Sequence, residues 1–340
     1  MQTQDPSKPS QHAGRRAIAA ACMLVVLFVA GLMWWWDSEP AQFDPVAVTQ
    51  TQMQELKRPV SVGATTTVAL ITSVRTLLDK RGGYLSNDKL PPGVLMDNLP
   101  NWEFGSLTAS RDLVRAMRND FSRSQTQSTE DKDLAEADPL LNSPNDRWLL
   151  PSTESQYRKA IGHMQGYLDR LGDSDESTAH FYARADNLAD YLQLASSRLG
   201  SLSQRLSASV GQLPINETTP TGALSPASSV AAPGAGRIVK TPWNKIDDNF
   251  YEARGYTWAL LEQLRAMQQD FGPILRSKHA DVSLQQVIRE LEEAQRPLQS
   301  PIVLNGSPFG FFANHSLVMA NYVSRANAAI IELRELLKRG

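Results

Sequence analysis

The sequence predicts an all-α protein in which an N-terminal transmembrane helix precedes a helical bundle with an internal duplication. Three observations support this. Residues 17–36 form an uncharged apolar run. Apolar residues then recur every three or four positions along most of the chain, and no segment shows the sustained alternation of a strand. Finally, RAMRNDF at 115–121 returns as RAMQQDF at 265–271, the kind of self-similarity that an internal repeat leaves.

The overall composition is that of a folded protein without a general affinity for nucleic acid. Of the 340 residues, 41% are hydrophobic and 21% are charged, close to the averages for globular proteins. The formal net charge is -2 and the basic residues are dispersed among acidic ones, so we predict no nucleic-acid partner. The single cysteine, Cys22, excludes an intramolecular disulfide.

The apolar run at 17–36 reads AIAAACMLVVLFVAGLMWWW. A helix of about twenty residues spans about 30 Å, the thickness of a bilayer's hydrocarbon core. We therefore predict a transmembrane helix whose partner is the lipid bilayer. Its three terminal tryptophans, Trp34 to Trp36, are expected at the headgroup layer, where amphipathic rings are favoured.

The residues that flank this run predict its orientation. Arg15 and Arg16 precede it and acidic residues follow, so the positive-inside rule makes residues 1–16 a cytoplasmic tail and places the C-terminal domain on the other side. A cleavable signal peptide needs small residues at its cleavage site, and WWWDSEP fits this poorly. The sequence thus favours an uncleaved signal anchor at 17–36.

Residues 37–60 are expected to form a juxtamembrane linker, after which helices and loops alternate. A helix beginning near residue 64 is followed by a connection at 90–105, which we expect to be non-helical because prolines interrupt it. The first heptapeptide and the residues after Thr153 belong to further predicted helices.

A heptad seam runs from 181 to 206, with apolar residues at alternating spacings of four and three. Such a seam either zips to a second copy, giving a homo-oligomer, or packs inside one bundle. The flanking positions lack a consistent pattern of opposite charges, which favours the intramolecular alternative. The seam consists of Phe181, Ala185, Leu188, Leu192, Ala195, Leu199, Leu202 and Leu206.

The composition then changes abruptly. Residues 214–236 are mostly Pro, Gly, Ala, Ser and Thr, and such a stretch buries too little apolar surface to offset the entropy of ordering. We predict a flexible linker at 214–240, between a first helical half at 61–213 and a second at 241–340.

The duplication extends beyond the heptapeptide. LAEADPLLNSP at 134–144 aligns without gaps to LEEAQRPLQSP at 291–301, and each half closes with an amphipathic helix. This predicts similar halves about a pseudo-twofold axis. The pairs Arg115/Arg265 and Asp120/Asp270 would be equivalent, as structural ion pairs or caps. The alternative is chance, because short helical patterns recur easily.

Three motifs resemble a bacterial family of single-pass membrane proteins that is known only as a domain of unknown function. They are GGYLSNDKLPPGVLMDNLPNWEFG, RAMRNDFSRSQ and PWNKIDDNFYEARGYTWALL, and the similarity covers nearly the whole chain. The resemblance implies a Gram-negative inner-membrane protein with a periplasmic domain, which agrees with the cytoplasmic N-terminus predicted from the flanking charges. It brings no established catalytic residues to transfer.

The sequence offers little support for catalysis. Its five histidines never fall at metal-ligand spacings, and phosphate-binding glycine loops are missing, so we predict no metal and no cofactor. One segment, 243–258, is rich in aromatic and acidic residues. Its candidate catalytic carboxylates are Asp247, Asp248 and Glu252. Its candidate binding residues are Trp243, Tyr251, Arg254, Tyr256 and Trp258.

Two interpretations of this segment remain open. Aromatic faces stack on sugars and paired carboxylates divide acid and nucleophile roles, as in a glycan-binding or glycan-cleaving groove. Alternatively, the aromatic residues fill the core while the charged ones pair or face solvent, which is the more common arrangement. We favour the second. The predicted function is a membrane-anchored periplasmic interaction or scaffold protein with an envelope protein partner and no catalysis; the alternative is an envelope hydrolase or glycan-binding protein.

Overall fold

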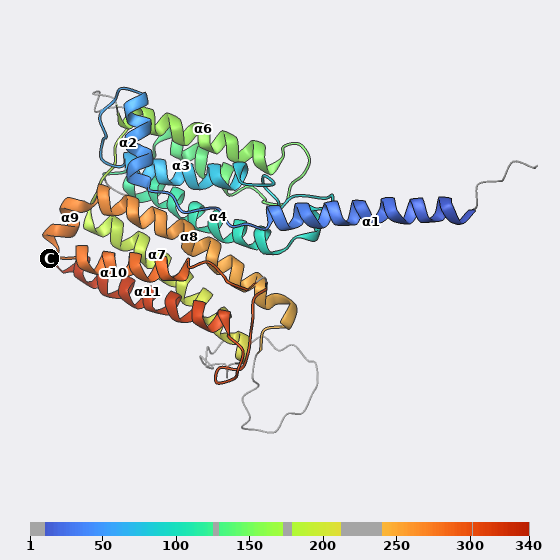
Figure 1. The fold of residues 1–340 in the computed structure, drawn as a ribbon. Helices are drawn as coiled ribbons and strands as arrows, with labels where there is room; N and C mark the ends of the chain where they lie inside the picture. The colour runs from blue at the N-terminus through green and yellow to red at the C-terminus, as the bar shows by residue number, and fades with distance from the viewer. Residues whose placement is uncertain (1–10, 125–128, 173–178, 212–239, 301, 340) are drawn as a thin grey trace, which may run out of the picture.

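The computed structural model describes residues 11–124, 129–172, 179–211, 240–300 and 302–339 (Figure 1). Over these residues the chain forms eleven α-helices and no strand, which confirms the predicted all-α class. A lone β-bridge joins Asn305 to Asn314. The linker predicted at 214–240 lies, except for its last residue, outside the described residues.

The first helix, α1 (Gln11–Trp36), projects away from the rest of the molecule (Figure 1). Its apolar stretch, Gly14–Trp36, is 23 residues long and has none of its most apolar window buried. By length and composition this helix could cross a membrane or act as a signal sequence. An exposed apolar helix at this position agrees with the predicted 17–36 segment.

The segment after α1 is packed onto the bundle and includes a helix. Trp36 lies against Gly82, where an added Cβ would come within 2.7 Å of the indole. Asp44 then caps α2 (Pro45–Glu55) by accepting hydrogen bonds from the backbone N–H groups of Val46 and Ala47 at 2.9 and 3.2 Å. Because α2 buries Thr49 and Met53 among other residues, part of the linker expected at 37–60 is instead a packed element.

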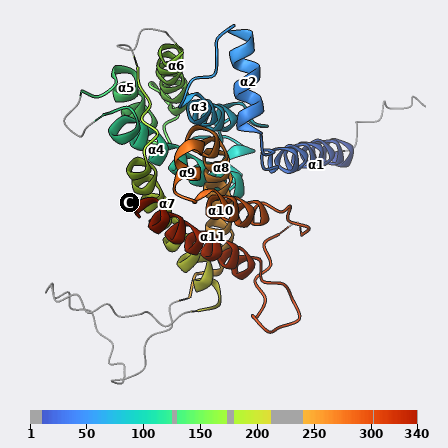
Figure 2. The same ribbon diagram turned by 90° about the vertical axis from the view of Figure 1, so that its left-hand side faces the viewer.

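The bundle consists of two sets of four long or medium helices (Figures 1 and 2). The N-terminal set comprises α3 (Ala64–Asp79), α4 (Asn98–Ala116, continued by the π-helical turn Met117–Phe121), α5 (Lys132–Leu141) and α6 (Thr153–Leu171). The C-terminal set comprises α7 (Ala185–Ser207), α8 (Ile246–Asp270), α10 (Asp281–Ala294) and α11 (His315–Lys338), with the short α9 (Gly272–Ser277) after α8. Single 3₁₀ turns lie at Gly93–Leu95, Ala208–Val210 and Trp243–Lys245.

The two sets meet along α4 and α8, the most extensive helix pair in the fold. At their crossing, a Cβ on Gly105 would lie 2.0 Å from the carbonyl oxygen of Glu252, and one on Gly255 would lie 1.9 Å from that of Trp102. Only glycine permits this approach. Gly105 and Gly255 are 150 positions apart, as are Trp102 and Glu252, so the contact is reciprocal between the two helices.

Both heptapeptides end these central helices. Phe121 and Phe271 are fully buried, and their ring centroids lie 5.4 Å apart. Asp270 caps α3, because its carboxylate accepts hydrogen bonds from the N–H and hydroxyl of Thr66, both at 2.7 Å. Asp120 lies beside the start of α7, where its carbonyl accepts a hydrogen bond from Asn187 at 3.1 Å.

The arginines of the heptapeptides also have matching partners. Arg115 donates to Asn142 at 3.2 Å and Arg265 donates to Glu292 at 2.7 Å. These partners are again 150 positions apart.

The second sequence match does not follow this spacing. LAEADPLL lies within α5, whereas LEEA forms the last turn of α10 and the residues after it lie in a loop. Buried residues of α5 and α10 instead correspond at the spacing of 150 found for α4 and α8: Leu134 with Leu284, Ala137 with Val287, and Leu141 with Leu291. The alignment of 134–144 with 291–301, at a spacing of 157, therefore differs from this register by seven residues, two helical turns, a shift that preserves an apolar face.

Two further expectations change. α4 begins at Asn98 and contains Pro100, so the connection at 90–105 is shorter than predicted, because the first turn of a helix tolerates proline. The heptad seam of 181–206 packs within the bundle: Leu192 and Leu199 are fully buried, and α7 packs along α11. This agrees with the favoured intramolecular alternative and leaves this seam unavailable to a second copy.

Candidate functional site

The aromatic and acidic segment lies at one end of α8. Trp243 belongs to the 3₁₀ turn before the helix and is 87% exposed. Asp247 and Asp248 lie in the first turn, where negative charge is favoured by the helix dipole. The other predicted residues follow along α8.

The three candidate carboxylates are engaged separately. Asp248 forms an ion pair with Lys245 at 2.6 Å. Both oxygens of Glu252 accept hydrogen bonds from Arg205 on α7, at 2.6 and 2.5 Å, a bidentate geometry that fixes both partners. Asp247 accepts a hydrogen bond from the N–H of Asp248 at 3.2 Å. Asp248 and Glu252 thus each have their own cation.

Two of the aromatic residues belong to the core. Tyr256 is buried, and burial raises the pKa of its hydroxyl, with Tyr191 and Asp112 adding to the rise. Trp258 is also buried, and its ring contacts those of Trp102 and Phe43 at centroid distances of 5.1 and 5.8 Å. Both positions stabilise the packing of α8 against its neighbours.

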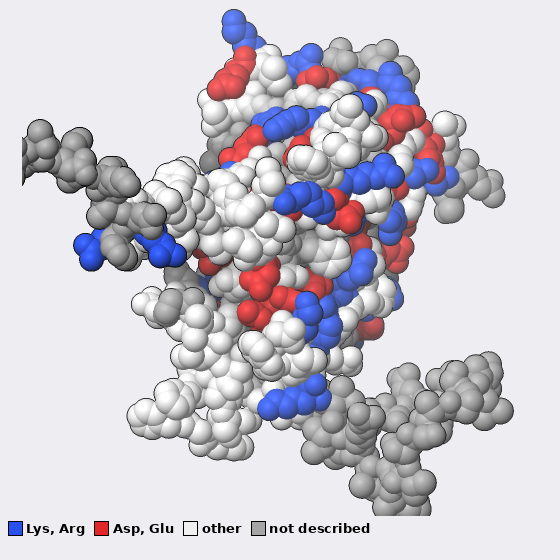
Figure 3. All heavy atoms as spheres, turned by 90° about the vertical axis from the view of Figure 1, so that its right-hand side faces the viewer, with Lys and Arg blue, Asp and Glu red and all other residues white. Residues whose placement is uncertain are grey.

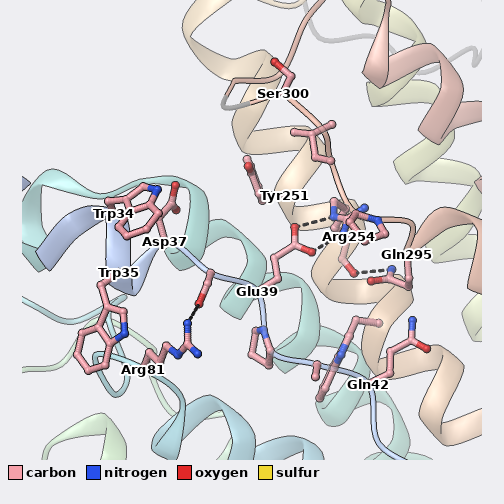
Figure 4. Close-up of a pocket in the computed structure, with 16 residues that line it drawn as sticks. Trp34, Trp35, Asp37, Glu39, Gln42, Arg81, Tyr251, Arg254, Gln295 and Ser300 are labelled. Carbon is pink, nitrogen blue, oxygen red and sulfur yellow. Dashed lines mark hydrogen bonds and ion pairs between the residues drawn. The ribbon is translucent and has the colours of Figure 1, made fainter. Parts of the chain in front are cut away.

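One side of α8 lines a pocket where α1 joins the bundle (Figure 4). We call it the exit pocket; its volume is about 670 Å³. Three of the five predicted binding residues, Tyr251, Arg254 and Trp258, line it, whereas Trp243 and Tyr256 do not. The other walls come from the end of α1, the segment after it, Arg81 and the chain that follows α10.

Arg254 is the central contact of the exit pocket (Figure 4). Its Nε and Nη2 donate to the two carboxylate oxygens of Glu39 at 2.6 and 2.5 Å. Its Nη1 donates to the carbonyl oxygens of Ala294 and Arg296 at 3.1 and 3.0 Å, and its guanidinium lies 5.8 Å from the ring centroid of Phe250. Arg254 therefore joins the segment after α1, α8 and the end of α10.

A second buried carboxylate holds the same segment a few residues further on. Glu262 accepts a hydrogen bond from the N–H of Phe43 at 3.3 Å and pairs with Arg265 at 3.2 Å. Burial raises the pKa of Glu262 to about 7, against the opposing effect of Arg265. Inside the pocket, burial together with Asp37 and Glu39 raises the pKa of the Tyr251 hydroxyl.

The exit pocket offers aromatic faces and a charge pair that is already satisfied. Such a surface suits packing or the binding of an amphipathic group better than proton transfer, because both Glu39 oxygens accept from Arg254. In the described part of the chain, no three His, Cys, Asp or Glu side chains gather as metal ligands would.

The sequence did not indicate Glu39, Arg81 or Gln295 as site residues. Glu39 is separated from Arg254 by 215 positions, and no local pattern signals a partner at that distance. Trp34 and Trp35, predicted at the headgroup layer, also line the exit pocket.

The comparisons with known proteins agree with the resemblance seen in the sequence. No curated protein and no solved structure matches this chain. One family model does, over residues 10–340, and its description is "Uncharacterized protein conserved in bacteria (DUF2333)". Because the match covers nearly the whole chain, the protein belongs to this bacterial family.

Proposed function

We propose that this protein is a membrane-anchored interaction or scaffold protein of the bacterial cell envelope. In this proposal α1 crosses the inner membrane once, with the N-terminus in the cytoplasm and the helical domain in the periplasm. The exposed apolar surface of α1 and the preceding Arg15 and Arg16 support this orientation.

The observation that carries the proposal is the fixed connection between α1 and the bundle. Glu39 is held by Arg254, Phe43 by Glu262, and Trp36 packs against Gly82. An enzyme that acts on diffusing substrates has no need of a fixed orientation to its anchor. A protein that positions partners at a membrane does, and this connection would hold the bundle at a set height and angle.

The alternative, an envelope hydrolase or glycan-binding protein, depends on Asp247, Asp248 and Glu252. The pairing of Glu252 with Arg205 and of Asp248 with Lys245 favours a structural role instead. A retaining or inverting pair must face a shared substrate, with one carboxyl able to donate a proton.

A topology and complementation experiment tests the proposal. A reporter that is active only outside the cytoplasm should be active when fused after Gly340 and silent when fused before Arg15. In a deletion strain, full-length Glu252→Gln and Asp248→Asn should restore the wild-type envelope phenotype. Cleavage to a form without α1 would contradict the anchor. A stable carboxylate variant that fails to complement would favour the hydrolase.

We also infer that the bundle arose by internal duplication, from a unit of four helices. The reciprocal Gly105 and Gly255 contact, the Phe121 and Phe271 pair and the common spacing of 150 support it. The unit would be α3–α6 in the first copy and α7, α8, α10 and α11 in the second. Its boundary would then fall before α7, whereas the division at 61–213 and 241–340 places α7 in the first half.

A further inference from the structure

One end of the bundle exposes a concentration of aromatic side chains. Figure 1 shows that α4, α8 and α11 begin at the end from which α1 leaves, and that the α5–α6 and α10–α11 loops lie there too. Within the described chain, all exposed Trp and Phe side chains outside α1 belong to these loops or helix starts: Phe104, Trp148, Trp243, Phe309, Phe311 and Phe312. The surfaces of soluble proteins seldom have so many exposed aromatic side chains close together.

The α10–α11 loop presents its aromatic residues on an ordered stem. The N–H of Gly306 donates to the carbonyl of Ala313 at 3.0 Å, and the Asn314 side chain donates to the carbonyl of Gly306 at 2.7 Å. Beyond this stem lie residues 307–312, here named the C-terminal tip, in which Phe309 and Phe311 are 103% and 99% exposed. The sequence 297–314 contains no charged residue.

The α5–α6 loop is built in a similar way. The Thr153 hydroxyl donates to the carbonyl of Pro144 at 3.0 Å, and its N–H donates to that of Arg147 at 3.1 Å. The residues 148–151, here named the N-terminal tip, include Leu150, which is 97% exposed. Each tip thus belongs to the loop that joins the last two helices of its own four-helix set.

Several observations identify the surface that these tips fit. α1 leaves from the same end, with Trp34 and Trp35 exposed at its last turns, and aromatic side chains favour the headgroup layer of a bilayer. Figure 3 shows this end face on: acidic and basic side chains are intermixed over its centre, with an uncharged area at its lower left. A mixed charge pattern provides no complement to a strongly charged partner, whereas apolar tips match a lipid surface.

We propose that the two tips insert into the interfacial layer of the membrane that α1 crosses, and so seat the bundle on the bilayer at three points. This inference rests on the proposed membrane anchor. Because the contacts are apolar, neutral phosphatidylcholine suffices and anionic lipid is unnecessary.

Site-directed fluorescence in nanodiscs tests the inference on the full chain. Single cysteines are introduced in a Cys22→Ser background by Leu150→Cys, Phe311→Cys, Phe28→Cys or Val282→Cys, and each is labelled with the fluorophore NBD. Phe28 reports on the span of α1. Val282 is a matched control, because it is apolar, 64% exposed, and in the first turn of α10, which begins at the end of the bundle opposite α1 (Figure 1). The nanodiscs contain phosphatidylcholine with or without a nitroxide-labelled lipid.

We expect nitroxide lipid to lower NBD emission about twofold at residues 150 and 311, as at residue 28, and by less than about a tenth at residue 282. Quenching at residue 28 with none at residues 150 and 311 overturns the insertion and leaves the anchor intact. An unquenched residue 28 overturns the anchor itself. Tip probes that are shielded from aqueous iodide but not quenched by lipid indicate a protein partner or a second copy, which also overturns the insertion.

Discussion

At the scale of single residues, burial determines how the charged groups around the exit pocket behave. The Glu262 side chain is fully inaccessible to solvent, yet it has a cation, Arg265, and a backbone donor, Phe43. The loss of water outweighs both, so the pKa of Glu262 rises from 4.5 to about 7. This carboxyl therefore holds its proton more tightly in the folded protein than in the unfolded chain.

The sign of the resulting pH dependence follows directly. Between 4.5 and about 7 the folded state binds more protons at Glu262 than the unfolded state does, so stability falls as the pH rises through this window. Glu262→Gln removes this titration, so the difference in the free energy of unfolding between low and high pH should shrink, by at most about 3 kcal/mol. Chemical denaturation of the full chain in detergent, at about pH 5 and about pH 8, measures this difference.

Glu292→Gln is the matched control for that experiment. It removes the other carboxylate partner of Arg265. Because the Glu292 side chain is 42% exposed, this substitution should leave the pH dependence of stability unchanged. If Glu262→Gln keeps the wild-type slope, a different buried acid carries it. Asp270, whose pKa burial also raises, would be the next candidate.

At the scale of elements, the crossing of α4 and α8 depends on two glycines. Gly105→Ala would place a methyl group 2.0 Å from the carbonyl oxygen of Glu252 and 2.6 Å from the N–H nitrogen of Tyr256. These are backbone atoms of a long buried helix, which can yield only if the two helices separate. We expect a loss of about 3 kcal/mol in the free energy of unfolding, at the upper end for overpacking.

Gly162→Ala provides the control for this substitution. Gly162 lies within α6 and an added Cβ there meets nothing within 4 Å, so the higher helix propensity of alanine should stabilise by up to about 1 kcal/mol. The denaturation midpoints of the two variants should move in opposite directions. Equal shifts for Gly105→Ala and Gly162→Ala would show that the crossing is looser than these distances indicate.

The positions of the helices were easier to predict from the sequence than the elements against which each helix packs. α6 and α7 follow their apolar spacing, because a face buried along its whole length leaves a regular pattern. The start of α4 was missed because Pro100 indicates a break in most contexts and a first turn in this one. The sequence match between α5 and α10 differs by two helical turns from the spacing of 150 found where α4 and α8 cross, because apolar periodicity alone does not fix register.

The exit pocket shows the same limit. Tyr251, Arg254 and Trp258 were candidates because aromatic and charged residues cluster in their segment. Which residues of this segment pair with Arg205, enter the core or line the exit pocket depends on the neighbours of α8, which sequence spacing does not identify. Glu39 lies in a segment expected to be a linker, and only the folded chain brings it to Arg254.

At the scale of the whole molecule, the two helical sets share one hydrophobic core. A single cluster of buried residues includes side chains from every long helix of both sets. α7 also joins α11 through polar contacts, with Ser196 donating to Asn327 at 2.7 Å and the Ser203 and Ser324 hydroxyls 2.6 Å apart. From this shared burial we predict that the bundle unfolds as one cooperative unit.

This shared core predicts the result of cutting the chain between α7 and α8. A protease site inserted between Ala223 and Leu224 should allow cleavage without separating the fragments, because α4 packs on α8 and α7 on α11. Size-exclusion chromatography in mild detergent should show both fragments in one peak. Adding Leu199→Asp, which puts a charge at a fully buried position of α7, should release them, because an unpaired buried charge is strongly unfavourable. Separation of the fragments without that substitution would instead mean that residues 61–213 and 241–340 are independent domains, each stable without the other's helices.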